Sequence, residues 1–392
     1  MKKNIFNNEK KINKSKLRKL IIAIFLLCMI ITAVVLYMAN ENYREVIDKY
    51  VFKKEIQEEN LLSIEIDTSK ISGIYAYDKY LAVLQDNKLE LYNKFGKKEG
   101  NIDIEIVTPD FESNGNYLVI AEKNGNRVYF VNGKTIVWQK DVEGKISNVN
   151  VNKNGYVSII IQGTSYKTVV KTFDSNGNEL FTSYHASTNV VAADVSNDNK
   201  YLAIAEVNYS GIIAQSMIKI ISIEDAKTNS VNSIKYTHVA NEGDLIVNIK
   251  YQNKNNLICM YERHIDVLNN ENNNNELLSL KDKNILFADI SLQSKVVSIT
   301  KKGTGIFNSE SEMQIIDSNN KGTTTVEIEN VPKSILIQDN VIVVNLGTSA
   351  LFIKENGWLQ KKYESSHEIQ NILCCRELAG IVSKNKIELI SL

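Results

Sequence analysis

The feature that most constrains the fold is a short unit that recurs eight times after residue 60. In its clearest copies, a turn containing Asn, Gly or Asp precedes a strand of apolar residues, as in Asn114–Ala121 (NGNYLVIA) and Asp198–Ala205 (DNKYLAIA). The apolar strands begin at residues 80, 117, 156, 201, 257, 295, 341 and 378, at intervals of 37 to 56 residues. A four-stranded sheet with its turns has a length of about 40–50 residues. The chain after residue 60 is therefore predicted to consist of repeated four-stranded sheets.

The neighbours of each copy predict how these sheets are arranged. An upstream strand such as 107–111 and a downstream strand such as 89–92 accompany the repeated unit, and a tight turn leads to a fourth strand. The last copy reaches Leu392 after only three strands, and Leu61–Ile66 (LLSIEI) can supply the missing fourth. Such closure removes open sheet edges. The sequence predicts an all-β fold, a β-propeller over residues 61–392, with eight blades favoured and seven as the alternative because the spacing is uneven.

A different kind of segment precedes the repeats. Leu20–Met38 contains nineteen residues without a charge, enough for a helix to cross a bilayer. Residues 1–19 carry eight Lys and Arg against one acid, a net charge of +7, so the positive-inside rule places them in the cytoplasm. We therefore expect a basic cytoplasmic tail (1–19), a transmembrane helix (20–38) and a single-pass protein of the cell membrane whose C-terminal domain is extracytoplasmic.

Two alternatives to an uncleaved anchor are a signal peptide and a lipoprotein signal at Cys28. The apolar run is longer than the core of a signal peptide and lacks a small-residue cleavage site, and Leu27 is large for a lipoprotein signal. Residues 39–60 are charged, with Tyr43, Val46 and Tyr50 at helical spacing, which predicts a short juxtamembrane helical stalk.

Charge also limits the partners of the predicted ectodomain. The whole chain has 46 basic and 46 acidic residues, so a tail of +7 leaves −7 for the rest. Nucleic-acid binding depends largely on Lys and Arg at phosphates. A nucleic acid is therefore not expected as a partner.

The chain resembles a family of single-span proteins from Gram-positive bacteria with propeller ectodomains. The resemblance is carried by the NGxYLxIA unit at residues 114–121 and by Asp174–Leu180 (DSNGNEL), in this order after an N-terminal anchor. The blades are similar in outline to WD40-like and quinoprotein-like repeats. The resemblance covers residues 20–392 and implies the fold, without implying an activity or any catalytic residue.

Motifs for catalysis, cofactors and metals are not found. The sequence contains no GxSxG, HExxH or GxxxxGK[ST] pattern, so no catalytic residue is assigned. Asp174–Glu179 resembles a calcium loop but has Glu179 at the sixth position and His185 at the twelfth, so we expect a hairpin turn and no metal. The chain contains only two Trp, which argues against a quinone cofactor, and we expect no cofactor. Both Trp are expected to pack between blades.

Three further sets of residues have a structural and a functional interpretation. Cys374 and Cys375 could form a vicinal disulfide, but buried free thiols on opposite sides of a strand are the favoured interpretation. Asp110, Asp194 and Asp289 could form a ring of carboxylates around the channel, although hydrogen bonds to their own turns are the simpler expectation.

The third set is a group of His, aromatic and basic residues that the blade scheme places in loops on one face. Variable loops carrying aromatic residues on a rigid scaffold are typical of partner-binding surfaces. The candidate partner-binding residues are His185, Tyr209, Tyr236, His238, Tyr261, Arg263, His264, Phe307 and His367.

These observations favour a membrane-anchored, non-enzymatic binding or scaffolding protein that presents this face to a protein or glycan of the cell envelope. An envelope enzyme that acts on glycan or peptide in the channel is the first alternative. A ligand sensor is the second, although a tail of nineteen residues contains no signalling domain.

Overall fold

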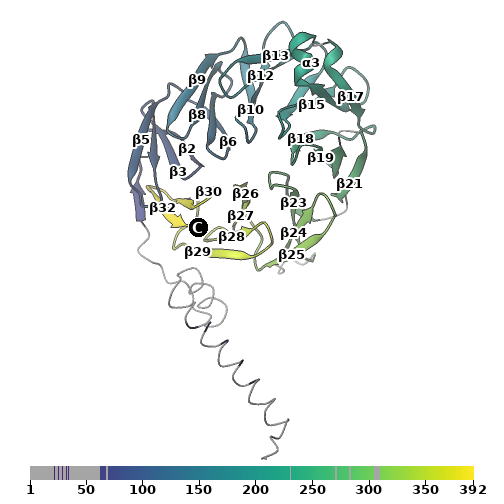
Figure 1. Cartoon of the computed structure of the whole chain (residues 1–392). Helices are drawn as coiled ribbons and strands as arrows, with labels where there is room; N and C mark the ends of the chain where they lie inside the picture. Colours follow the sequence, from purple (N-terminus) through teal and green to yellow (C-terminus); the bar gives the residue numbers. More distant parts are fainter. Residues whose placement is uncertain are drawn as a thin grey trace, which may run out of the picture. The chain divides into compact units, whose positions relative to one another are not determined.

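The computed structural model describes residues 62–67, 69–229, 231–269, 272–281, 284–303 and 310–392, and five single positions before residue 35. The chain divides into two compact units, residues 1–60 and 61–392. The second unit consists of eight antiparallel four-stranded sheets arranged around a central axis (Figure 1). The eight-bladed β-propeller is thus confirmed, and the alternative of seven blades is wrong.

Blades I to IV follow one another along the chain, each with its innermost strand first. They consist of β2 (Ile71–Tyr77), β3 (Tyr80–Gln85), β4 (Lys88–Tyr92), β5 (Lys98–Asp103); β6 (Pro109–Asn114), β7 (Tyr117–Glu122), β8 (Arg127–Asn132), β9 (Thr135–Asp141); β10 (Lys145–Val151), β11 (Val157–Gln162), β12 (Thr168–Phe173), β13 (Glu179–His185); and β14 (Asn189–Val195), β15 (Tyr201–Asn208), β16 (Gln215–Ser222), β17 (Ile234–Val239).

Blades V to VIII continue the ring, and the last includes the first strand of the domain. They consist of β18 (Ile246–Tyr251), β19 (Asn256–Tyr261), β20 (His264–Asn269), β21 (Asn274–Ser279); β22 (Ile285–Asp289), β23 (Lys295–Lys301), β24 (Ser311–Asp317), β25 (Thr323–Ile328); β26 (Ser334–Gln338), β27 (Val341–Asn345), β28 (Ser349–Lys354), β29 (Leu359–Glu364); and β30 (Asn371–Cys375), β31 (Leu378–Val382), β32 (Lys386–Ser391), β1 (Leu62–Glu65).

The ring closes through the pairing of β1 with β32. Leu62 lies opposite Leu389 and Ile64 opposite Ile387, and the side chain of Ile64 is buried against Ile387 and Leu389. The predicted closure by the two ends of the domain is therefore confirmed. An unpaired outer edge on β32 is avoided in this way.

Short turns with left-handed backbone precede the second strand in six of the eight blades. Gly115 has φ +60° and Asn199 has φ +61°, conformations that Gly and Asn adopt at low cost. In the β12–β13 turn, between the third and fourth strands of blade III, the Asp174 Oδ1 atom accepts hydrogen bonds from the backbone N–H groups of Asn176 (2.9 Å) and Asn178 (2.8 Å). The carboxylate of Asp174 thus stabilises a hairpin turn, as the residue pattern predicts.

The core lies between blades and is formed by the alternating apolar side chains of their strands. Trp138 of β9 stacks on Phe130 at 5.1 Å between ring centroids and also contacts Phe173 of blade III. Trp138 therefore packs between blades as expected. Trp358 was expected in an outer strand, but it lies in the β28–β29 turn and is 47% exposed.

One blade departs from the repeat. Blade IV carries a short helix, α3 (Ile223–Thr228), and a 3-10 turn, η1 (Val231–Ser233), between its third and fourth strands. This insertion accounts for the 56-residue interval in the sequence. Ile223 and Ala226 of α3 are buried in a cluster with Phe181 of β13, so the helix joins blade IV to blade III (Figure 1).

The three cysteines of the propeller are buried and free. Cys374 belongs to the apolar cluster on one side of β30, and Cys375 belongs to the cluster on the other side. The two adjacent thiols therefore face opposite sides of one strand, as expected.

The predicted transmembrane helix and stalk fall almost entirely outside the described residues. Five positions within residues 20–38, Ile22, Phe25, Met29, Thr32 and Val34, are helical and exposed. Within the part of the chain that the structure describes, no helix meets the length and hydropathy needed to span a bilayer. The anchor remains a prediction.

Candidate functional site

Two faces of the propeller must be distinguished. The connections between blades and those between the second and third strands lie on one face, which we call the loop face. The connections from first to second and from third to fourth strand lie on the other, which we call the turn face.

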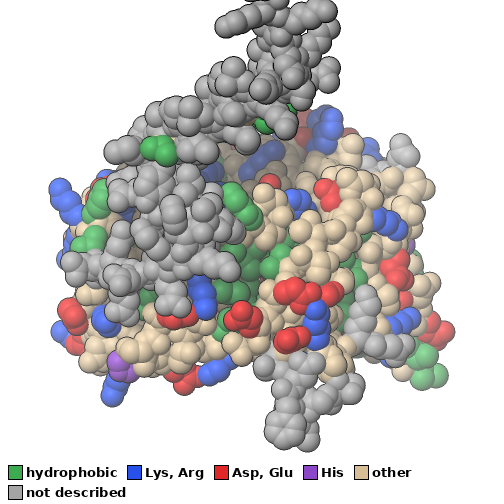
Figure 2. All heavy atoms as spheres, turned by 90° about the horizontal axis from the view of Figure 1, so that it is seen from below, with side chains coloured by type: hydrophobic (Ala, Val, Ile, Leu, Met, Phe, Trp, Pro, Cys, Tyr) green, Lys and Arg blue, Asp and Glu red, His purple; other side chains and the backbone are tan. Residues whose placement is uncertain are grey.

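Along the edge shown in Figure 2, Lys and Arg side chains alternate with Asp and Glu, so this edge carries charges of both signs.

Three of the candidate partner-binding residues are exposed in loop-face connections. Tyr209 lies between β15 and β16 and is 53% exposed, Arg263 lies in the β19–β20 turn, and His367 lies between β29 and β30. Their positions on three separate blades (IV, V and the junction of VII with VIII) mean that the structure does not bring them together into one cluster.

Three other candidates are buried in the core. His185 ends β13, Tyr261 ends β19 and His264 begins β20, and each is less than 10% exposed. The rings of Tyr261 and His264 stack at 4.5 Å. These residues were expected in loops, but strands reach as far as their positions, and the alternation of side chains turns them inward.

The remaining candidates differ again. Tyr236 and His238 lie in the outer strand β17, where Tyr236 Oη donates a 2.6 Å hydrogen bond to the carbonyl of Asn269 in blade V. Tyr236 is thus a contact between blades and its hydroxyl points to the turn face. His238 is half-buried, and burial lowers its pKa. Phe307 lies outside the described residues.

The loop face instead shows a group of exposed apolar side chains on three consecutive blades. These residues, which we call the apolar rim, are Tyr166, Tyr184, Tyr209, Ile212, Ile213, Val239 and Val247. They occupy the loop-face ends of blades III, IV and V, and the rings of Tyr166 and Tyr184 lie 4.7 Å apart. Elsewhere on the loop face, Val107 is the one large apolar side chain that is exposed among the described residues.

The tip of the β15–β16 loop contributes most to the apolar rim. Ile212 is fully exposed and Ile213 is 49% exposed. Single exposed apolar residues are ordinary on protein surfaces, whereas large exposed apolar patches are found at interaction sites. Only Tyr209 of the rim belongs to the set chosen from sequence, since Ile212 and Ile213 lack the His, aromatic or charged character used for that choice.

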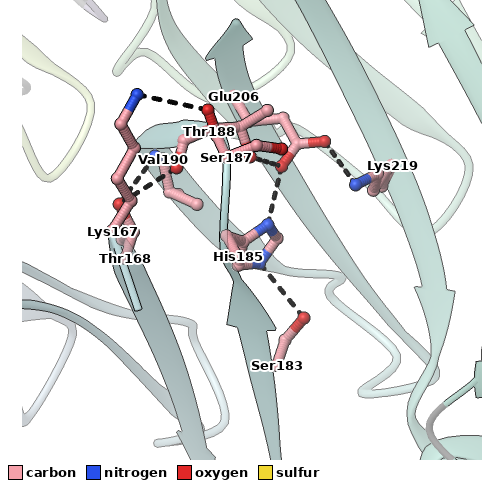
Figure 3. A network of polar contacts seen from close by, with 9 residues as sticks. All are labelled: Lys167, Thr168, Ser183, His185, Ser187, Thr188, Val190, Glu206 and Lys219. Carbon is pink, nitrogen blue, oxygen red and sulfur yellow. Dashed lines mark hydrogen bonds and ion pairs between the residues drawn. The ribbon is translucent and has the colours of Figure 1, made fainter. Parts of the chain in front are cut away.

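Beneath the rim, a buried polar network joins blade III to blade IV (Figure 3). His185 Nδ1 lies 2.6 Å from Glu206 Oε2, which also accepts a 2.7 Å hydrogen bond from Thr188 Oγ1. Lys219 forms an ion pair with the other oxygen of Glu206. Burial alone would raise the pKa of Glu206, but these three donors outweigh it and lower the pKa to about 2.

The network also contains a Ser–His–Glu arrangement like the catalytic triad of serine hydrolases. Ser183 Oγ lies 3.1 Å from His185 Nε2, and Glu206 holds the other ring nitrogen. Both carboxylate oxygens of Glu206 are, however, occupied: Oε2 contacts His185 of blade III and Thr188 of the connection between the blades, and Oε1 pairs with Lys219 of blade IV. The geometry therefore supports a structural role, which is to fix the end of β13 against β15 below the apolar rim.

The central channel contains a second group of charged side chains. Glu112 of β6, Asp194 of β14 and Lys250 of β18 interact electrostatically across it. Burial raises the pKa of Glu112 to about 7 and that of Asp194 to about 6, and Lys250 opposes both shifts. Elevated carboxyl pKa values of this kind are found at catalytic sites as well as in structural clusters.

Two of the three Asp residues of the predicted ring, Asp194 and Asp289, accept hydrogen bonds from different partners. Asp289 Oδ1 accepts a 2.6 Å hydrogen bond from the backbone of Ser291, in its own turn, as expected. Asp194 Oδ2 instead accepts a 2.6 Å bond from the backbone N–H of Tyr251 in the next blade. The expectation for Asp194 is therefore wrong, because the adjacent inner strand, and not its own turn, supplies the donor.

Hydrogen bonds between distant blades connect the walls of the channel near the turn face. Gln338 Nε2, at the end of β26, donates to the carbonyl of Ala76 (2.5 Å) and to Ser113 Oγ (3.2 Å). Ser113 Oγ in turn donates to Tyr75 Oη at 3.4 Å. Blade VII is thus linked to blades I and II.

The fold and these sites define an eight-bladed β-propeller protein. A family model matches residues 49–392, and the chain therefore belongs to the family of unknown function DUF5711. No match was found among curated proteins.

Solved structures share the fold at very low sequence identity. BamB from Moraxella catarrhalis matches with a TM-score of 0.50 and 11% identity, over 85% of this chain and 99% of that chain. The β-propeller domain of Cps50 (Swd1) from Myceliophteria thermophila gives a TM-score of 0.47 and 10% identity, over 76% and 100%. Hydrazine synthase from Kuenenia stuttgartiensis gives 0.44 and 10%, over 86% and 99%. The similarity to BamB shows the fold alone.

Proposed function

We propose that this protein is a membrane-anchored, extracytoplasmic binding or scaffolding protein whose loop face docks another protein of the cell envelope. The observation that carries the proposal is the apolar rim on blades III to V. Protein interfaces combine a central apolar and aromatic region with a polar margin. The rim supplies three Tyr and four aliphatic side chains, and Arg263 and Lys167 lie in adjacent loops of the same face.

A rigid platform supports the rim. Loops on a fixed scaffold lose little conformational entropy on binding, which favours affinity. Glu206 and His185 fix the strand end that carries Tyr184, and the pairing of β15 with β16 extends to Asn208 and Gln215. Only the residues between these two strands form the protruding tip.

The location rests on the N-terminal segment. An uncharged stretch from Leu20 to Met38 follows eight basic residues, which is the pattern of an N-in anchor. In this arrangement the propeller lies outside the cytoplasm, where its partner is a protein of the envelope.

The test is an in-cell crosslinking experiment with the full chain. Tyr209→Ala together with Ile212→Ser removes two rim side chains without touching the core, and we expect it to abolish recovery of a crosslinked protein. Phe95→Ala is the matched control, because Phe95 is 67% exposed in the β4–β5 turn on the turn face. Recovery of the same protein by the wild type and by the double variant would contradict the proposal.

A second candidate function is an envelope enzyme acting on a glycan or peptide in the channel. It is favoured by Glu112, whose pKa of about 7 would let it exchange a proton near neutral pH beside Asp194 and Lys250. Glu112→Gln should then abolish hydrolysis of cell-wall glycan or peptide by the purified full chain. Absence of turnover by the wild type, or equal turnover by the variant, would exclude this function.

A further inference from the structure

A cavity of about 460 Å³ lies on the turn face between blades III and IV. Its walls come from the first turn of each blade and from the insertion that contains α3. The lining residues are Tyr156, Asn199, Lys200, Tyr201, Ser222, Ile223, Glu224, Asp225, Lys227 and Lys235. Small-molecule sites have volumes of about 300–1,000 Å³, so the cavity is large enough for a ligand.

One wall of the cavity is an insertion in blade IV. The connection between third and fourth strands is residues 223–233 in blade IV, whereas it is only 93–97 in blade I and 133–134 in blade II. A tight turn is sufficient to connect two antiparallel strands. The longer segment instead packs Ile223 and Ala226 against Phe181 of blade III and forms one wall of the cavity.

Aromatic rings and free hydroxyl groups meet in this cavity. Tyr156 and Tyr201 are each partly exposed, and within the part of the chain that the structure describes neither phenol oxygen has a hydrogen-bond partner. A Tyr ring offers an apolar face and a hydroxyl that both donates and accepts. Such groups suit a ligand that has apolar C–H faces and hydroxyl edges.

The charged groups of the cavity are mixed, with a positive excess. Lys235 Nζ lies 2.6 Å from Asp225 Oδ2, and Lys227 Nζ lies 3.0 Å from Glu224 Oε2. The third cation, Lys200, is 4.0 Å from Asp198 Oδ2, beyond hydrogen-bond distance, and its side chain is 71% exposed. The Lys200 ammonium is thus available to an anionic group on a ligand.

We propose that this cavity binds an acidic saccharide. In this arrangement the sugar rings contact Tyr156 and Tyr201, the hydroxyl groups exchange hydrogen bonds with the phenols and with Asp225, and the acidic group of the saccharide contacts Lys200. The site lies on the turn face and does not depend on the proposed docking of a protein at the apolar rim. A protein with both sites would join an envelope glycan to an envelope protein.

The proposal is tested by calorimetric titration of the detergent-solubilised full chain. The probes are a galacturonic acid oligosaccharide, a neutral maltose oligosaccharide of the same length, and inorganic phosphate. We expect the acidic oligosaccharide to bind most tightly. Lys200→Glu should lower its affinity about tenfold, which corresponds to the loss of one charge-assisted hydrogen bond. Tyr201→Phe, which keeps the ring and removes only the hydroxyl, should weaken it by about threefold, as loss of one neutral hydrogen bond does.

Lys79→Glu is the matched control, because Lys79 is an exposed Lys in the equivalent first turn of blade I. It should leave the affinity unchanged, and thermal unfolding should show that all variants are folded. The proposal is overturned by three results: no binding of the acidic oligosaccharide, equal affinities in Lys200→Glu and Lys79→Glu, or displacement of the oligosaccharide by phosphate alone. None of these results bears on protein docking at the rim, so failure of one proposal leaves the other standing.

Discussion

At the scale of single residues, Glu206 is the group whose loss should matter most for stability. Its carboxylate is fully buried and is held by His185, Thr188 and Lys219. Glu206→Gln leaves the cation of Lys219 without its partner, which in buried pairs costs about 3 kcal/mol. We expect this loss in the free energy of unfolding, measured by urea denaturation at pH 7. Glu224→Gln is the control, since the exposed pair of Glu224 with Lys227 should contribute less than about 1 kcal/mol.

The same carboxylate should impose a pH dependence on stability. Its pKa is lowered to about 2 in the folded state from about 4.5. A lowered pKa stabilises the fold above the unfolded value, and this contribution is lost as the pH falls from 4.5 towards 2. Wild-type stability should therefore fall across this range more steeply than that of Glu206→Gln. Parallel curves for the two proteins would contradict the assigned ion pair.

The carboxyl group of Glu112 should give the opposite pH dependence of stability. Burial raises its pKa to about 7, so the unfolded chain, with a pKa of about 4.5, loses this proton at lower pH than the folded protein. The folded state is then destabilised as the pH rises from 4.5 to 7. Glu112→Gln removes this effect and should be more stable than the wild type at pH 8 but not at pH 4. Equal effects at both pH values, measured by denaturant unfolding, would rule out a neutral Glu112 in the channel.

At the scale of structural elements, the pairing of β1 with β32 is the contact that closes the ring. Ile64 is buried in this pair, whereas Ser63 beside it is exposed. Ile64→Ala should cost about 3 kcal/mol, as expected for a buried Ile. Ser63→Ala, in the same strand, should change stability by less than about 0.5 kcal/mol. Thermal unfolding of both variants tests whether the first strand is part of the cooperative fold.

The elements that could be predicted from sequence are those with a local signal. Gly115 and Asn199 mark turns because few other residues adopt their backbone angles, and each is followed by an apolar strand. Helix α3 has a local start signal, because the Ser222 side chain accepts a hydrogen bond from the Asp225 N–H, but it is only six residues long, and Ile223 and Ala226 are stabilised by Phe181 of another blade. Its existence depends on a contact that only the folded ring provides.

The candidate site was harder to predict for a related reason. His185 and His264 lie at strand ends, where a shift of one residue exchanges the buried and exposed faces. Ile212 and Ile213 lie at a loop tip, where apolar residues give no periodic pattern. Prediction of a surface therefore needs the strand ends to be known to a single residue, and sequence patterns define them less closely than that.

At the scale of the whole molecule, eight similar sheets give two faces with different properties. The loop face carries the apolar rim, and the turn face carries the cavity beside α3. The cavity lies on blades III and IV and the rim on blades III to V, and the two features lie on opposite faces. Two ligands on opposite faces can bind simultaneously without steric conflict, which is the physical requirement for a scaffold.

The location of the molecule is the remaining prediction at this scale. A helix formed by Leu20–Met38 would be about 28 Å long, close to the apolar thickness of a bilayer, and the eight cations before it oppose translocation of the N-terminus. We expect the full chain to stay in the membrane fraction after alkaline carbonate extraction, and a C-terminal tag to be digested by protease added to spheroplasts. Residues 39–392, expressed without the apolar segment, should be released by the same extraction. Release of the full chain, or protection of the tag in intact spheroplasts, would show that the propeller is not held outside the membrane by this segment.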